Sequence, residues 1–264
     1  MAAHIEVRNL RKVFQFGSSK RGLLALSEVN FAIKPGEFVC ILGPSGCGKS
    51  TILNILGGLD ATYEGEVLVD GVSLSSTPSQ KRRIGYIFQE PRLLPWRSVL
   101  RNITFALESV GHPRSAARET AQSFINLVGL TGFEHHYPYQ LSGGMQQRTS
   151  IARAFAVDPD ILYMDEPFSS LDEITARSLR EELLEIWRKT HKTILFVTHN
   201  SMEATFLSDR IFLMTRRPGR IYEEVTVDLP RPRALDDPRL FALNNRIVTN
   251  FLSTIGELRG ARGA

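Results

Sequence analysis

The feature that most constrains this chain is the run from Gly43 to Ser50, which reads Gly-Pro-Ser-Gly-Cys-Gly-Lys-Ser. It fits the pattern Gly-x-x-x-x-Gly-Lys-Ser/Thr and lies between an apolar strand pattern, Glu37 to Leu42, and an apolar helix pattern that begins at Ile52. Such a loop presents backbone N–H groups and a helix N-terminus to phosphate groups. The sequence therefore predicts a nucleotide-binding α/β protein.

Two side chains of this loop have expected roles of their own. Lys49 is placed to reach the β- and γ-phosphates, and the Ser50 hydroxyl is a candidate Mg²⁺ ligand. Cys47 is interpreted as a small residue that fills the loop rather than as a reactive thiol.

The remaining pattern indicates a mixed sheet with crossover helices. The clearest predicted strands are Glu37–Leu42, Ile84–Phe88, Ile161–Met164, Thr193–Val197 and Arg210–Met214. Four of these five are nearly continuous apolar runs, as expected of strands covered on both faces. The N-terminal segments Ile5–Val7 and Val29–Ile33 alternate instead, which is typical of an antiparallel portion with one solvated face. Helical spacing dominates from Pro91 to Ala156, and an amphipathic helix is expected after Pro238.

A pair of acidic residues follows the apolar run Ile161–Met164. Asp165 and Glu166 come directly after it, and the carboxyl ends of strands are where open α/β sheets bind ligands. Asp165 is placed to hold Mg²⁺ through water, and Glu166 to polarise the water that attacks the γ-phosphate. Taken alone, the pair is equally typical of an ordinary strand-to-turn boundary.

Composition narrows the class of protein further. The 264 residues carry 32 Lys+Arg and 28 Asp+Glu, and a net charge of +4 is too weak a field to favour nucleic acid as a partner. No apolar run reaches the roughly 18 residues of a membrane span, and no signal-peptide pattern opens the chain. We expect a soluble protein that stays in the cytoplasm.

The segment Leu141 to Arg148, Leu-Ser-Gly-Gly-Met-Gln-Gln-Arg, resembles the signature sequence of ATP-binding cassette (ABC) ATPases, and Asp165 follows Arg148 by seventeen residues, as is usual in that family. The resemblance covers nearly the whole chain. It extends to further family elements: the adenine-stacking aromatic residue Phe14, the Q-loop glutamine Gln89, the D-loop Ser169–Asp172 and the switch histidine His199. Phe16 is an alternative to Phe14, and Asn200 stands where the family often has Asp.

The resemblance implies a set of site residues. The implied catalytic residues are Glu166 and His199, and the implied Mg²⁺ ligands are Ser50, Gln89 and, through water, Asp165. The implied ATP contacts are Phe14, Gly43, Pro44, Ser45, Gly46, Cys47, Gly48, Lys49, Ser50, Thr51 and Gln89. Asp172 belongs to the D-loop, and the residues expected on the ATP of a partner subunit are Ser142, Gly143, Gly144 and Gln146.

The same resemblance implies a fold: a phosphate-loop NTPase of the ABC type. Residues 1–264 would form one ATP-binding domain whose nucleotide-binding core comprises 1–90 and 157–235. A helical signature subdomain would occupy 91–156, and a C-terminal helix would occupy 236–264.

The implied assembly is a head-to-tail dimer of two ATPase subunits, because one chain holds two phosphate cradles that face different nucleotides. Three segments together resemble the ATPase subunits of importers in the nitrate, sulfonate and taurine group: Glu90–Trp96, Asp165–Phe168 and Pro218–Ile221. The implied partners are two transmembrane permease subunits and an external solute-binding protein, with the chain on the cytoplasmic face of the inner membrane. Leu93, Trp96 and Arg97 suit an interface, although a loop anchored by a buried Trp96 is equally compatible.

Other classes are less favoured. A cassette ATPase acting on nucleic acid or ribosomes usually has two tandem cassettes or a long coiled-coil insertion, and this chain has one signature. A GTP-binding switch or small-molecule kinase would need no segment like Leu141–Arg148, and an exporter more often fuses its membrane domain to the cassette. The basic positions Arg216, Arg217, Arg220, Arg231 and Arg233 are interpreted as a solvated face.

Overall fold

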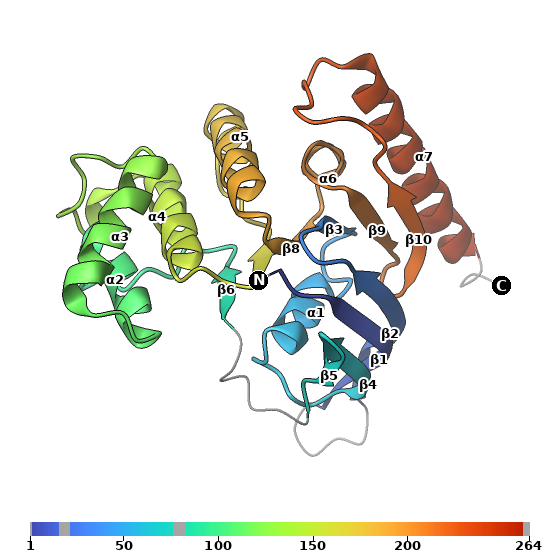
Figure 1. Cartoon of the computed structure of the whole chain (residues 1–264). Helices are drawn as coiled ribbons and strands as arrows, with labels where there is room; N and C mark the ends of the chain where they lie inside the picture. The colour runs from blue at the N-terminus through green and yellow to red at the C-terminus, as the bar shows by residue number, and fades with distance from the viewer. Residues whose placement is uncertain (1, 16–21, 76–82, 261–264) are drawn as a thin grey trace. The chain divides into compact units, whose positions relative to one another are not determined.

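The computed structural model describes residues 2–15, 22–75 and 83–260, and it divides into two compact units (Figure 1). The loop unit comprises Ala3–Ser79 and Thr193–Ala264, and it contains the phosphate loop. The helical unit comprises Gln80–Lys192 together with the first two residues. Each helix in the described ranges is too short or too polar to cross a membrane.

The N-terminal part of the loop unit is an antiparallel sheet with the strand order β2-β1-β4-β5. Its strands are β1 (Ile5–Gln15), β2 (Gly22–Ile33), β4 (Glu64–Val69) and β5 (Val72–Ser73). Ile5 pairs with Ile33 on one side and with Val69 on the other, so β1 is a central strand. Ile5 and Val7 are buried while Glu6 is half-buried, which confirms the alternating antiparallel portion.

The second sheet portion of the loop unit has the order β10-β9-β3-β8. Its strands are β3 (Phe38–Leu42), β8 (Thr193–Thr198), β9 (Arg210–Met214) and β10 (Ile221–Thr226). β3 is parallel to β8 and β9, whereas β10 is antiparallel to β9. Every residue of β3 and β8 is buried, as the continuous apolar runs predict.

Among its described residues, the loop unit contains three helices: α1 (Lys49–Leu56), α6 (Ser201–Leu207) and α7 (Pro238–Gly260). In α7, Leu240 and Ile247 are buried, and α7 packs on α6 (Figure 1). The predicted amphipathic C-terminal helix is therefore confirmed.

In its described residues, the helical unit combines a parallel strand pair with α-helices (Figure 1). The pair is β6 (Ile84–Ile87) and β7 (Ile161–Asp165), and the helices are α2 (Val99–Ser109), α3 (Arg114–Leu127), α4 (Gly143–Ala156) and α5 (Glu173–Thr190). α2, α3 and α4 pack on one another around Ile103, Ile125 and Ile151, which are at most 1% exposed. This bundle confirms the helical spacing predicted between Pro91 and Ala156.

The basic tail corrects the sequence interpretation. Arg233 is 7% exposed and donates to the carbonyl oxygens of Thr205, Phe206 and Ser208 at the end of α6. Burial lowers the pKa of Arg233 to about 10. Arg231 pairs with Asp209 and also donates to a backbone carbonyl. The solvated-face interpretation is wrong for these two residues, because the last carbonyls of a helix need donors from elsewhere in the chain.

Candidate functional site

The phosphate loop of the loop unit wraps around the side chain of Lys49. Lys49 is 4% exposed, and its Nζ donates to the carbonyl oxygens of Gly43 at 2.8 Å and Pro44 at 3.2 Å. Gly46 and Gly48 have φ angles of +75° and +110°, a region that favours glycine. The two glycines thus allow the sharp curvature that keeps the loop around the ammonium group.

Helix α1 begins directly after this loop. Its N-cap is Gly48, no side chain caps it, and its first turn contains no acidic residue. Ser50 is exposed and Thr51 is half-buried. The first N–H groups of a helix carry partial positive charge and need acceptors, so this helix start suits an anionic ligand.

His199 lies at the same sheet edge as the phosphate loop. Leu42 at the end of β3 pairs with Thr198 at the end of the parallel strand β8, and the amide of Gly43 donates to the carbonyl of Thr198 at 3.3 Å. His199 follows immediately and is exposed. Among the predicted site residues, the loop and His199 are therefore brought together.

Asn200, which stands where the resembled family often has Asp, caps helix α6. Its side-chain oxygen accepts from the amides of Met202 at 2.9 Å and Glu203 at 3.2 Å, and it thereby caps α6. Asn and Asp are similarly good N-caps. The position has a structural role that either residue can fill.

Phe14 lies near the end of β1 and is half-buried. The ammonium group of Lys12 lies 4.9 Å from the centroid of its ring, and Lys12 is also paired with Asp60 at 2.6 Å. One face of the Phe14 ring thus has a cation beside it. The alternative residue, Phe16, lies outside the described residues.

The acidic strand end belongs to the helical unit. Asp165 ends β7 and is half-buried, and Glu166 follows in a left-handed conformation with φ of +43°. Both the amide and the hydroxyl of Ser169 donate to the carbonyl of Glu166, at 3.2 and 3.0 Å. A non-glycine residue held in this region is strained, and such strain is concentrated at functional sites.

Gln89 is brought to the same turn. Ile87 of β6 pairs with Met164 of β7, so both strands end at one edge. The exposed Gln89 donates from Nε2 to Ser169 Oγ at 3.3 Å. Burial, followed by the nearby Asp165 carboxylate, raises the pKa of Tyr86 in the same strand. Sequence reasoning placed Ser169 in the D-loop but could not predict its bridging role, which depends on the tertiary pairing of β6 with β7.

The signature segment starts helix α4. Ser142 is its N-cap, and Ser142 Oγ accepts from the amide of Met145 at 3.3 Å. A methyl group at Gly144 would lie 2.7 Å from Cγ2 of Thr175, so α5 approaches closely at this point. Gln146 donates from Nε2 to the carbonyls of Pro138 and Leu141 at 3.0 and 3.3 Å. Gly143 has open space around it.

Asp172 caps helix α5 in the same unit. Its carboxylate accepts from the amide of Thr175 at 3.0 Å, and this hydrogen bond lowers the pKa of Asp172. Of the predicted residues, the helical unit therefore holds Gln89, Asp165, Glu166, Asp172 and the signature segment, and the loop unit holds the others.

The segment that precedes α2 presents an apolar side chain to solvent. Trp96 is 70% exposed, which excludes the alternative of a loop anchored by a buried tryptophan. The segment is nevertheless held firmly, because the buried Asn102 side chain donates to the carbonyls of Leu94 and Arg97 at 3.2 and 2.9 Å. Trp96 is thus displayed on an ordered segment.

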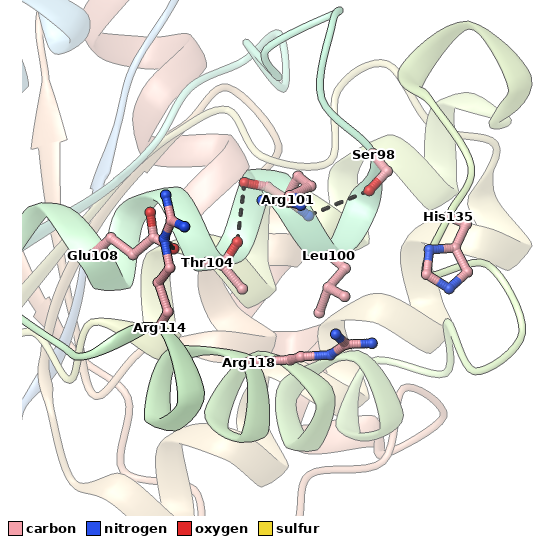
Figure 2. Close-up of a pocket in the computed structure, with 8 residues that line it drawn as sticks. All are labelled: Ser98, Leu100, Arg101, Thr104, Glu108, Arg114, Arg118 and His135. Atoms are coloured by element: carbon pink, nitrogen blue, oxygen red, sulfur yellow. Dashed lines mark hydrogen bonds and ion pairs between the residues drawn. The ribbon is translucent and has the colours of Figure 1, made fainter.

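A separate pocket of about 290 Å³ lies between α2 and α3 (Figure 2). Three arginines, Arg101, Arg114 and Arg118, line it together with one glutamate, Glu108, so it carries a surplus of positive charge. None of the residues that the sequence predicts for the nucleotide lines this pocket.

The fold and the phosphate loop define a nucleotide-binding protein of the ATP-binding cassette type. A family model described as ABC transporter matches residues 26–169. An uncharacterized ABC transporter ATP-binding protein of Methanocaldococcus jannaschii is 50% identical over 233 residues, 88% of this chain and 85% of that protein. The chain belongs to the ABC transporter family, and it is the ATP-binding and ATP-hydrolysing subunit.

Two further relatives have names that state a solute. The aliphatic sulfonates import ATP-binding protein of Bacillus cereus is 41% identical over 236 residues, 89% of this chain and 92% of the relative. The taurine import ATP-binding protein of Yersinia pestis is 44% identical over 218 residues, 83% of this chain and 84% of the relative.

A solved structure supports the fold. A dimeric ATP-binding cassette in a post-hydrolysis state, bound to ADP and phosphate, matches with a TM-score of 0.76 and 33% identity. The match covers 86% of this chain and all of that structure. The predicted cassette fold is confirmed.

Proposed function

We propose that this chain is the ATPase subunit of an importer that takes up a small organic or inorganic anion of the sulfonate, taurine or nitrate type. The observation that carries the proposal is the 41% and 44% identity to sulfonate and taurine import ATPases over more than four-fifths of the chain. The chain would act on the cytoplasmic face of the membrane, with two separate permease subunits and an external solute-binding protein.

ATP is the substrate, and we assign its phosphates to the loop Gly43–Thr51. Lys49 would exchange its carbonyl acceptors in the loop for phosphate oxygens, a stronger charge-assisted interaction. The half-buried ring of Phe14 offers a stacking face for the adenine. Residues 1–90 and 157–235 would form the nucleotide-binding core of one domain, with 91–156 as the signature subdomain and 236–264 as a C-terminal helix.

Hydrolysis is assigned to Glu166 and His199. The Glu166 carboxylate would polarise the attacking water, and the imidazole of His199 would hydrogen-bond the γ-phosphate and orient that water. Closure of a head-to-tail dimer would place Ser142, Gly143, Gly144 and Gln146 on the nucleotide of the other subunit, with Asp172 in the D-loop beside it.

The resemblance also implies a magnesium ion bound together with the phosphates. The described residues contain no group of three or more His, Cys, Asp or Glu that could hold a metal by themselves. Mg²⁺ in such sites instead takes one or two protein oxygens, substrate phosphates and water. Ser50 with its exposed position, Asp165 through water and Gln89 are the oxygen donors that we assign to it. The ion would neutralise charge that develops on the phosphates.

Affinity purification of the tagged chain from native membranes, followed by mass spectrometry, tests the proposal. We expect a permease with several membrane-spanning helices to copurify. Recovery of ribosomes or nucleic acid without a permease would overturn the importer assignment while leaving the ATPase assignment intact.

A matched pair of variants sharpens this experiment. Trp96→Ala should reduce recovery of the permease without reducing ATP binding, because Trp96 is 70% exposed on the segment proposed as the interface. Phe241→Ala, which changes an exposed aromatic residue of α7, is the control and should leave recovery unchanged. Uptake assays with sulfonate, taurine and nitrate on the purified complex would then identify the solute class.

A further inference from the structure

The turn between β9 and β10 contacts the phosphate loop from outside. Arg217 in this turn donates to the carbonyl oxygen of Gly46 from Nε at 3.3 Å and from Nη2 at 3.2 Å. A methyl group at Gly46 would lie 3.3 Å from the same guanidinium nitrogen, so the side chain lies directly against the loop. Both residues are exposed, which keeps this contact accessible to solvent and salt.

Gly219 brings the same turn against the next residue of the loop. A methyl group at Gly219 would overlap the carbonyl oxygen of Cys47 and the terminal methyl of Met214. The turn is also fixed to β2, because the amide of Gly219 donates to Ala25 at 2.8 Å and the amide of Ser27 donates to Gly219 at 3.0 Å. A rigid piece of backbone therefore supports the position of Arg217.

The end of β9 supports the loop from the inside. The Sγ of Cys47 lies 3.5 Å from the Sδ of Met214, and both residues are buried. A methyl group at Gly43 would lie 3.1 Å from Cβ of Met214. The loop is thus held between the end of β9 and the turn that follows β9.

The position of Arg217 has an electrostatic consequence for the loop. The carbonyl that it binds belongs to the peptide group between Gly46 and Cys47. That group also carries the amide N–H of Cys47, which donates within the loop to the carbonyl of Pro44 at 3.3 Å. A donor on the carbonyl of a peptide group polarises it and strengthens its N–H as a donor. A guanidinium at this distance also attracts a multiply charged anion bound in the loop, although salt weakens the attraction.

We infer that Arg217 is a positioning residue for the nucleotide and that the turn Thr215–Arg220 is an outer support of the phosphate loop. Its ligand class is the phosphate chain of a nucleoside triphosphate, reached through the backbone of Gly46 and Cys47. The inference rests on the proposed assignment of this loop to the ATP phosphates, and it gives a role to Arg217, which the sequence interpretation left as part of a solvated face.

Equilibrium binding of a fluorescent ATP analogue to the full chain, at low and high salt, tests the inference. Arg217→Ala should weaken binding about threefold to tenfold at low salt and less at high salt, as expected for an exposed charge-assisted contact. The value of KM for ATP should rise by the same factor, while kcat should change by less than about twofold because Arg217 does not touch the reacting atoms.

Arg216→Ala is the matched control. Arg216 is the exposed neighbour with the same charge, and it forms no hydrogen bond or ion pair among the described residues. It should leave ATP affinity unchanged within about twofold. Equal effects of the two variants would overturn the inference, because they would show only a general loss of positive charge. Arg217→Lys should restore the salt dependence but only part of the affinity, since an ammonium lacks the planar fork of the guanidinium.

Gly219→Ala tests the support independently of charge. The added methyl group would displace the loop at Cys47, so ATP binding should weaken while thermal unfolding confirms that the chain remains folded. Wild-type affinity in this variant would contradict the supporting role of the turn. Lys49→Ala distinguishes a failure of the role given to Arg217 from a failure of the proposed phosphate site. Unchanged binding in that variant would mean that the assignment of the loop to the ATP phosphates is wrong.

Discussion

Helix α1 and helix α4 both begin at a glycine-rich segment, but their first turns are satisfied in different ways. The start of α1 has no side-chain cap, and the preceding loop is held instead by the buried Lys49. The start of α4 is capped by Ser142, whose hydroxyl accepts from the amide of Met145. Neither first turn contains an acidic residue.

This difference indicates how each helix start meets an anion. The start of α1 has no side-chain cap, which fits the proposal that a phosphate group binds there. The start of α4 has a serine cap, because the Ser142 hydroxyl accepts from the amide of Met145. A helix start that already has a cap within its own chain fits the proposal that it meets the nucleotide of another subunit.

The largest effect should follow from Lys49→Ala. This change removes the cation that organises the loop and that we assign to the phosphates, so ATP affinity should fall on the order of 100-fold or more. Equilibrium binding measures the loss. Lys34→Ala, a change at an exposed lysine of the same unit, is the control and should bind ATP normally.

A smaller effect is expected from Ser142→Ala at the start of α4. ATP hydrolysis should slow on the order of tenfold, because a donor to the partner's nucleotide is lost. ATP affinity of the dilute chain should not change. Thermal unfolding should show a cost of about 1 kcal/mol for the lost cap. Ser142→Thr keeps a hydroxyl and should recover most of both; a fall in dilute ATP affinity instead would break the comparison with α1.

At a third helix start, that of α6, the effects of capping and of catalysis can be tested separately. Asn200→Ala should destabilise the loop unit by about 1 kcal/mol, because two backbone amides lose their acceptor. Asn200→Asp should restore the cap and leave the ATPase rate near that of the wild type. A large change in rate for Asn200→Asp would show that the position contributes more than a cap.

The smallest effect concerns pH and the cap of α5. The pKa of Asp172 is lowered by the amide of Thr175, so this carboxylate stabilises the folded state above its unfolded pKa of about 3.9. The contribution is lost as the pH falls through the lower folded pKa. Asp172→Asn keeps a cap without a titrating group, and it should make acid unfolding slightly less steep below about pH 4. Identical acid profiles would contradict this assignment.

The sequence alone was sufficient to predict the strands and helix starts that depend on a pattern of neighbouring residues. The apolar runs ending at Leu42, Met164 and Val197 predicted buried strands, and the loop between Gly43 and Ser50 fixed the start of α1. The roles of the individual site residues stay predictions, although the structure places the phosphate loop beside His199 and Gln89 beside the turn at Glu166.

Features that depend on distant partners could not be predicted in the same way. Arg233 looked like a solvated charge because its acceptors are carbonyls at the end of α6, about 28 residues earlier in the chain. The contacts of Ser169 and Arg217 could not be predicted for the same reason, since their hydrogen-bond partners lie on other elements. Local periodicity describes which faces are apolar, but it does not describe which backbone groups lack partners.

The most direct test of the account is the oligomeric state of Glu166→Gln, measured by sedimentation with saturating ATP and Mg²⁺ and again with ADP. Removing the proposed base should slow hydrolysis about 100-fold or more while ATP still binds. We predict a stable dimer with ATP and a monomer with ADP, and the additional change Ser142→Ala should weaken that dimer. A Glu166→Gln chain that stays monomeric with ATP bound would contradict the claim that the start of α4 meets the nucleotide of a second subunit.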